Sequence, residues 1–182
     1  MKKVAIILGV LLVLILFYLM NNGLLTSVKI IEKEIGPYTL VYGEHKGDYS
    51  KIVHVQKKIY ETLAKDFKIK TTKGFGIFYD KPGTVPKEKM RSEGGCILEG
   101  KHNTKENIKK IKEKLKVKEY PKVKSITVDF PLKSKMSIII GTIKVYPKLN
   151  KYMTKKGYKP APALEVYDLV KGRTLYTFPV KK

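Results

Sequence analysis

The side chain with the most evident chemical potential is one acid in an apolar strand. Glu165 stands between Leu164 and Val166, and the two-residue period of a strand puts it on one face with Ala163 and Tyr167. A carboxylate on an inward face must be hydrogen-bonded, paired with a cation or protonated. Such a group selects cationic or hydrogen-bonding ligands, whereas the same glutamate on an outward face is merely solvated.

Aromatic rings are the natural partners of such a carboxylate, because their faces attract cations. The chain has 12 tyrosines, 6 phenylalanines and no tryptophan. A tyrosine hydroxyl beside Glu165 would also permit acid–base hydrolysis, which is the least favoured of the alternatives. The candidate ligand-binding residues are Glu165, Tyr42, Tyr79, Phe130, Tyr146 and Tyr167.

Other catalytic and metal-binding patterns are missing from the sequence. His45, His54 and His102 have no metal-ligand spacing with one another or with Cys96, the single cysteine. We find no Ser-His-Asp order, phosphate-binding loop or glycine-rich dinucleotide fingerprint. One cysteine also excludes an intrachain disulfide. We therefore expect no metal, no cofactor and no catalytic residue.

The elements that must position these side chains begin with one strand–helix–strand–strand unit. A β-rich run at 38–42 precedes a turn at 46–48, and residues 50–68 carry apolar side chains at helical spacing. Further strands are expected at 75–79 and around 96–98.

The second half of the chain repeats this order. Residues 125–130 alternate as a strand, a helical face follows from 136 to 143, and strands are expected at 164–168 and 174–178. Because proline disrupts a helix interior, Pro147 predicts that a second short helix begins there.

Five positions, Leu40, Tyr42, Ile52, Tyr79 and Asp80, recur as similar side chains 88 residues later. Generic amphipathic segments aligned by accident would give the same pattern. The favoured interpretation is an α+β fold with duplicated β-α-β-β halves. These halves form an antiparallel sheet with helices on one face and a ligand cleft between them.

The N-terminus predicts a membrane anchor. Val4 to Met20 is an uncharged run of 17 residues that follows Lys2 and Lys3, and 17 is about the shortest helix that spans a bilayer. A cleaved signal peptide is the alternative, although no Ala-x-Ala-like site follows. We expect an anchor over 1–26, a domain over 27–182, and, from the basic start, a domain outside the cytoplasm.

The chain is strongly basic, with 38 Lys and Arg against 16 Asp and Glu and a net charge of +22. Only two of the basic residues are arginines, the side chain that nucleic-acid readers favour, so we expect no nucleic-acid partner. Residues 101–124 hold ten lysines and three glutamates. They form a solvated helix face or a surface that docks on an anionic membrane. The candidate basic surface is Lys105, Lys109, Lys110, Lys112 and Lys116.

Three stretches carry a family resemblance: YGEHKGDY at 42–49, FGIFYDKP at 75–82 and ALEVYD at 163–168. In their order and spacing the chain resembles the GyrI-like (DNA gyrase inhibitor-like) effector-binding domains. FYDKPGTVPKEKMRS and KVYPKLNKYMTKKGYKPAPALEVYD are similar to a membrane-anchored subgroup that includes a testis-expressed autophagy receptor of the endoplasmic reticulum. The resemblance implies a duplicated fold whose concave, aromatic cleft holds Glu165.

The resemblance also bears on function. The receptor's autophagy role depends on a long disordered tail, and this sequence ends at Lys182, so that role is not expected. The role of a transcription regulator is not expected either, because no DNA-binding helix-turn-helix is present. We expect a monomeric, membrane-anchored, non-enzymatic sensor or sequestering domain for a small amphipathic ligand, cationic in the favoured case. The alternatives are docking through the lysine-rich surface and, less favoured, hydrolysis.

Overall fold

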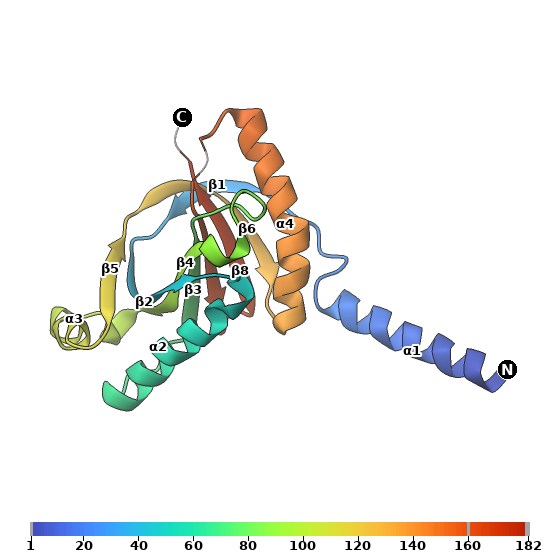
Figure 1. The fold of residues 1–182 in the computed structure, drawn as a ribbon, viewed down its shortest axis with the longest axis horizontal. Coiled ribbons are helices and arrows are strands. Elements are labelled where there is room, and N and C mark those ends of the chain that lie inside the picture. The colour runs from blue at the N-terminus through green and yellow to red at the C-terminus, as the bar shows by residue number, and fades with distance from the viewer. Residues whose placement is uncertain (1, 160, 181–182) are drawn as a thin grey trace.

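The computed structural model describes residues 2–159 and 161–180. Within them the chain forms one curved, eight-stranded antiparallel sheet (Figure 1). Helices α2 (Ile52–Asp66) and α4 (Lys135–Lys156) pack on one face of this sheet. Helix α1 (Lys2–Asn21) projects away from the body.

The strands fall into two halves of four. The first half comprises β1 (Ile31–Ile35), β2 (Tyr38–Lys46), β3 (Lys73–Phe78) and β4 (Arg91–Leu98). The short helix α3 (Lys105–Lys112) follows it. The second half comprises β5 (Lys116–Tyr120), β6 (Val123–Pro131), β7 (Ala163–Asp168) and β8 (Arg173–Pro179).

The order of strands across the sheet is β1-β6-β8-β7-β3-β4-β2-β5. Replacing each strand by its counterpart in the other half gives the same order reversed. The halves are therefore related by an approximate two-fold axis between β3 and β7, where Gly76 pairs with Glu165. The predicted α+β fold with duplicated β-α-β-β halves and helices on one face is confirmed.

Two edge strands were not predicted. β1 pairs with β6 of the other half, and β5 pairs with β2, so each half lends an edge strand to its partner. Their sequences, IEKEI and KVKEY, are too charged and too short to stand out as strands. Charged side chains suit a sheet edge, where they discourage pairing with another chain.

The predicted break at Pro147 is wrong, because α4 runs through it without interruption. A proline removes one backbone hydrogen bond from a helix interior. That loss is offset here because both halves of α4 bury side chains against the sheet, Ile140 and Val145 before the proline and Leu149 and Met153 after it. Gly157 ends the helix in a left-handed conformation, with φ of 68°.

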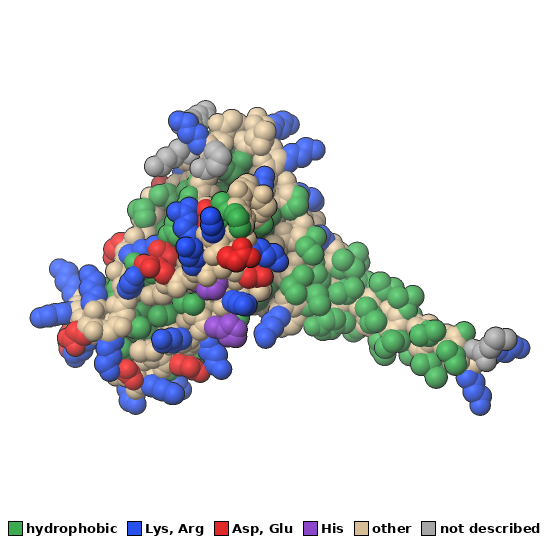
Figure 2. Space-filling view, viewed as in Figure 1, with side chains coloured by type: hydrophobic (Ala, Val, Ile, Leu, Met, Phe, Trp, Pro, Cys, Tyr) green, Lys and Arg blue, Asp and Glu red, His purple; other side chains and the backbone are tan. Residues whose placement is uncertain are grey.

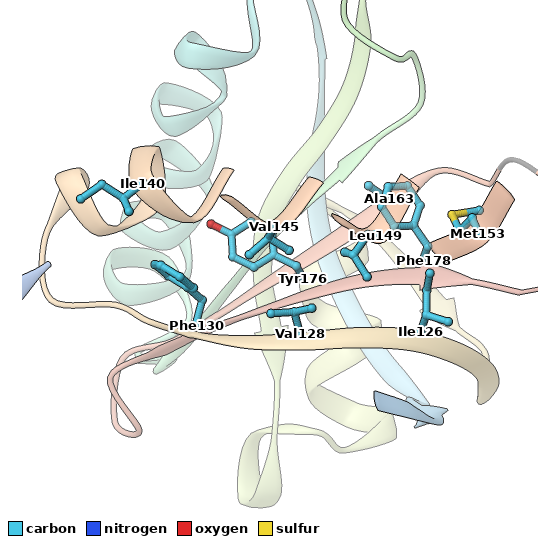
Figure 3. Close-up of a cluster of buried hydrophobic side chains, with 10 residues drawn as sticks. All are labelled: Ile126, Val128, Phe130, Ile140, Val145, Leu149, Met153, Ala163, Tyr176 and Phe178. Atoms are coloured by element: carbon cyan, nitrogen blue, oxygen red, sulfur yellow. The ribbon is translucent and has the colours of Figure 1, made fainter. Parts of the chain in front are cut away.

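Alternation along the strands divides the core between the two faces of the sheet. Figure 3 shows the cluster under α4: Ile126, Val128, Phe130, Ile140, Val145, Leu149, Met153, Ala163, Tyr176 and Phe178. The cluster under α2 comprises Val41, Ile59, Leu63, Ile69, Cys96, Leu98 and Ile111. The opposite face buries Ile35, Leu40, Phe75, Ile77, Ile97, Leu164, Val166 and Leu175.

Glycines set how closely the two helices approach the sheet. A Cβ built on Gly94 would lie 2.9 Å from Ile52 of α2, and one on Gly43 would lie 2.7 Å from Val55. In α4, a Cβ on Gly141 would collide with the Tyr176 hydroxyl. Both helices therefore lie close to the strands, with a space left between them.

Candidate ligand-binding cleft

A cleft of about 1390 Å³ lies between α2 and α4, over the centre of the sheet. Its floor comes from β3 and β7, the two strands at the approximate two-fold axis. The cleft therefore lies at the seam between the halves, as the duplicated sequence predicted. Its aromatic lining comprises Tyr49, Tyr60, Phe78, Tyr79, Tyr146, Tyr158, Tyr167 and Phe178.

Glu165 lies on the floor of this cleft and is 4% exposed. The hydroxyl of Tyr146 donates to one carboxylate oxygen at 2.6 Å, and that of Tyr167 donates to the other at 2.6 Å. Tyr146 comes from α4 and Tyr167 from β7 itself, so the tertiary fold joins two elements on one acid. Among the described residues, no salt bridge reaches Glu165.

Burial governs the ionisation of this group. Loss of solvent raises the pKa of the Glu165 carboxyl above its ordinary value, and the two tyrosine hydroxyls partly oppose the rise. Burial followed by the nearby carboxylate raises the pKa of Tyr146 and of Tyr167 well above the ordinary value, which keeps both hydroxyls as donors. When ionised, Glu165 is thus a desolvated anion without a countercharge among the residues that the structure describes.

The rings around Glu165 are held by edge-to-face packing. The Tyr146 ring meets those of Tyr176 and Phe178 at centroid distances of 5.8 Å, with interplanar angles of 84° and 86°. Because Tyr176 and Phe178 belong to the core under α4, the Tyr146 hydroxyl is directed by the core itself. A preorganised carboxylate needs little rearrangement to receive a ligand.

The sequence-predicted rings divide between the cleft and other surroundings. Tyr146 and Tyr167 reach Glu165. Tyr79 borders the cleft, but its hydroxyl is directed away from it and lies 3.4 Å from Lys118 Nζ, next to Tyr42. Phe130 is not at the cleft surface, because it is buried under α4 next to Gly23 and Gly141.

Tyr42 also lies outside the cleft. It projects from the opposite face of the sheet, where Lys118 Nζ lies 4.7 Å from its ring centroid. Lys118 also pairs with Glu93. Tyr42 therefore binds a cation within the protein itself. Strand alternation placed it on a face, but only the order of strands decided which face the helices cover.

Several cleft residues were not foreseen from the sequence. Gly74 of β3 lies opposite Tyr167 and lines the cleft, whereas Gly76, opposite Glu165, is covered by the Phe78 ring, which a Cβ would meet at 2.9 Å. Ile139 and Ile143 of α4 line the cleft with exposed side chains. The signal for Ile139 and Ile143 was present: α4 has more apolar residues than one buried face requires.

The lysine-rich segment lies elsewhere. In Figure 1, α3 and α1 are at opposite ends of the molecule. Thr104 caps α3, accepting a hydrogen bond from the Asn107 amide at 3.2 Å. The candidate lysines 105, 109, 110, 112 and 116 are all exposed. Six lysines of the segment pair with carboxylates, namely 110, 114, 116, 118, 122 and 124.

No family model matches the chain. Among curated proteins it is 28% identical over 152 residues to the testis-expressed protein 264 homolog of Mus musculus and 28% identical over 153 residues to testis-expressed protein 264 of Homo sapiens. These matches cover 80% and 81% of the chain and 47% of each relative. The chain therefore spans about half the length of the curated relatives it matches.

Solved structures share the fold at low sequence identity. The EcmrR C-terminal domain gives a TM-score of 0.60 at 16% identity, covering 86% of this chain and 99% of that one. SAV2435 bound to tetraphenylphosphonium gives a TM-score of 0.55 at 16% identity, covering 84% of this chain and 94% of that one. A hydrolase encoded by lin2189 from Listeria innocua gives a TM-score of 0.51 at 12% identity, covering 84% of this chain and 92% of that one.

EcmrR has also been solved as a complex with DNA, and that structure matches with a TM-score of 0.57 at 17% identity, covering 100% of this chain and 68% of that one. Identities this low establish the fold and nothing finer. This chain therefore shares the fold of the EcmrR C-terminal domain and of SAV2435.

Proposed function

We propose that this chain is a membrane-anchored, non-enzymatic domain that senses or sequesters a small amphipathic cation. The observation that carries the proposal is Glu165, a buried carboxylate held by two tyrosine hydroxyls on the floor of an apolar cleft. A buried anion without a paired cation is electrostatically unsatisfied. A cationic ligand supplies the missing charge.

The cleft wall defines the rest of the ligand. Ile52, Ile139 and Met153 offer apolar surface, and the rings of Tyr146 and Tyr167 flank the carboxylate. Aromatic faces around a desolvated cation stabilise it by about 2 kcal/mol or more. Binding of tetraphenylphosphonium by SAV2435, which shares the fold, supports a bulky, delocalised cation as a probe.

The test uses the full chain in detergent or phospholipid nanodiscs with tetraphenylphosphonium as the probe. We expect a saturable rise in melting temperature, and we expect Glu165→Gln to weaken binding at least tenfold. The control is Glu119→Gln, which removes the same charge from an exposed position on β5. Equal weakening by both variants would mean that only net charge matters, and the proposal would fail.

Hydrolysis is the competing use of the same site. Glu165 as general base and a tyrosine as general acid are within hydrogen-bond distance of each other. Burial raises the pKa of both tyrosines well above the ordinary value, which makes them poor acids near neutral pH. Turnover of a bound amphiphile that disappears in Glu165→Ala would establish the enzyme instead.

The membrane part of the proposal rests on α1. The helix has 20 residues, none of them buried, and it is long and apolar enough to cross a bilayer. We propose that it anchors the chain, that residues 27–182 form the body of the domain with Asn22 and Gly23 packed against it, and that Lys2 and Lys3 lie on the cytoplasmic side. Extraction by detergent but not by alkaline carbonate would support an anchor, and a cleaved N-terminus would exclude it.

The lysine-rich surface is the weaker candidate for function. Many of its lysines already have carboxylate partners, and α3 lies at the far end of the molecule from α1. A bilayer entered by α1 therefore does not face α3. We propose neither this membrane nor nucleic acid as a ligand for that surface.

A further inference from the structure

The end of α1 is joined to the start of α4 by buried hydrogen bonds. Asn22 is 2% exposed, and its Oδ1 accepts from the hydroxyls of Ser134 at 2.6 Å and Ser137 at 2.9 Å. The same two serines form the capping box of α4. The Asn22 amide nitrogen donates back to the Tyr18 carbonyl in α1 at 2.8 Å. One side chain therefore ties the last turn of α1 to the first turn of α4.

Neighbouring contacts strengthen this junction. Lys133 Nζ donates to Asn21 Oδ1 at 2.6 Å, and Lys144 Nζ donates to the Leu24 carbonyl. Gly23 packs directly on the Phe130 ring, where a Cβ would lie 2.7 Å from it. The helix leaves the domain from a defined position, and the bilayer entered by α1 begins at this end of the domain.

Exposed apolar side chains gather at the same end. Leu25 is 70% exposed and Val170, in the β7–β8 turn, is 75% exposed. That turn is bonded to the segment before α4, where the Leu132 amide donates to the Gly172 carbonyl at 2.8 Å. Figure 2 shows apolar surface continuing from α1 onto the adjoining part of the body. Lys133 and Lys144 flank it, as lysines do at a lipid headgroup layer.

The cleft extends to this end of the domain. Leu132 and Lys135 both line it, and they stand on either side of the residues bonded to Asn21 and Asn22. Leu169 of the β7–β8 turn lines it as well. One end of the cleft is therefore bordered by the same segments that carry the exposed apolar residues beside α1.

We propose that the β7–β8 turn and the start of α4 rest on the bilayer that α1 enters, and that the cleft receives its ligand laterally from the lipid. The ligand class is a single-chain amphiphilic cation dissolved in the bilayer. Its chain passes between Leu169 and Ile139, and its charged group reaches Glu165. This inference rests on the proposed function for the identity of the ligand and for the anchoring of α1 in a bilayer, whereas the position of the turn beside the end of α1 is given by the geometry.

The seating is tested in phosphatidylcholine nanodiscs with single cysteine variants of the full chain. Val170→Cys and Lys109→Cys, on the exposed face of α3, are each labelled with a fluorophore that brominated lipids quench. Burial raises the pKa of the Cys96 thiol, which keeps it from reacting. We expect strong quenching at 170 and little at 109. Equal quenching at both positions overturns the proposal.

The entry route is tested with hexadecyltrimethylammonium dissolved in the nanodisc lipid and tetraphenylphosphonium added from the water. Val170→Glu puts a charge on the turn without altering a cleft residue, and Lys109→Gln makes the same change of charge on α3. We expect Val170→Glu to slow uptake of the lipid-dissolved cation at least fivefold. Its affinity for tetraphenylphosphonium should stay within twofold of that of the wild type. Unchanged uptake overturns lateral entry.

The two proposals fail separately. If the wild type binds neither cation while the label at 170 is still quenched, the proposed function is wrong and the seating holds. If tetraphenylphosphonium binds but the label at 170 is not quenched, the cleft is a binding site that opens to water, and lateral entry is wrong. Slower uptake in Lys109→Gln as well would attribute the effect to net charge and would also overturn lateral entry.

Discussion

At the scale of residues, the described part of the chain gives Glu165 two neutral donors and no cation. Hydroxyls at 2.6 Å satisfy both oxygens, yet they do not cancel the charge that burial penalises. The pKa of Glu165 is raised because desolvation outweighs the two hydrogen bonds from the tyrosine hydroxyls. A ligand that brings positive charge stabilises the ionised form, so ligand binding and proton release are linked.

The first prediction concerns the pH dependence of binding. Glu165 binds a permanent cation such as tetraphenylphosphonium only when ionised, so affinity falls as pH drops through its raised pKa. Calorimetric titrations between about pH 4 and pH 8 should show this fall above the ordinary glutamate pKa of about 4.3. The Glu165→Gln variant should bind weakly at every pH, and a parallel fall in that variant would assign the titration to another group.

The second prediction concerns the stability of the ligand-free protein. Because the pKa of Glu165 is raised in the folded protein, this carboxyl loses its proton at a lower pH in the unfolded chain than in the folded one. The contribution of Glu165 to the free energy of unfolding is therefore complete below its pKa in the unfolded chain. That contribution is lost as pH rises through its pKa in the folded protein. Glu165→Gln should remove that decline, and at pH 7 its melting temperature should equal or exceed that of the wild type. A large drop would mean that the carboxylate itself holds the fold together.

At the scale of elements, the cleft exists because α2 and α4 lie close to the sheet at separate places. Gly43 and Gly94 let α2 approach β2 and β4, and Gly141 lets α4 approach the Tyr176 side chain. Larger residues there would lift the helices and change the width of the cleft. Gly74 has more room, since a Cβ would lie 3.5 Å from its nearest neighbour.

The third prediction compares two glycines on neighbouring strands. Gly94→Ala puts a methyl group 2.9 Å from Ile52 and should destabilise the protein by about 1–3 kcal/mol, as overpacking does. Gly74→Ala meets only ordinary contacts and should be neutral or stabilising by up to about 1 kcal/mol. Thermal denaturation of both variants measures the difference. Equal effects would show that strand propensity, and not the approach of α2, sets the requirement for Gly94.

At the scale of the whole molecule, the N-terminal segment that we propose as an anchor is also part of the domain's structure. Asn22 and Gly23 are buried against α4 and Phe130, so the packed region begins before residue 27, where the sequence placed the domain boundary. Ser134 and Ser137 would lose a buried partner if the chain began there.

The fourth prediction follows from that junction. A fragment of residues 27–182 should melt several degrees below one of residues 18–182. Leaving buried hydroxyls unpaired costs roughly 1–3 kcal/mol, and each kcal/mol shifts the melting temperature of such a domain by roughly 2–4 °C. Asn22→Ala in the longer fragment should reproduce most of the loss. Equal melting temperatures for the two fragments would mean that the junction adds nothing to the fold.

The local sequence was sufficient to predict the helices and strands that recur in the two halves, because their residue patterns lie within each element. Apolar side chains at helical spacing identified α2, alternation identified β6 and β7, and glycines marked the turns at 47 and 172. The same signals were insufficient at β1 and β5, whose few charged residues become strands through pairing with the opposite half. At Pro147, packing on the sheet outweighed the local preference for a break.

The sequence by itself determined that Glu165 shares a strand face with Ala163 and Tyr167, because a strand's period of two is a property of the backbone. It also determined that α1 is uncharged from Val4 to Met20. Only the tertiary structure decided that Tyr146 joins Glu165, that Tyr42 and Phe130 do not, and that α1 ends beside the cleft. Those outcomes depend on strand order and helix docking, which arise from contacts between residues far apart in the chain.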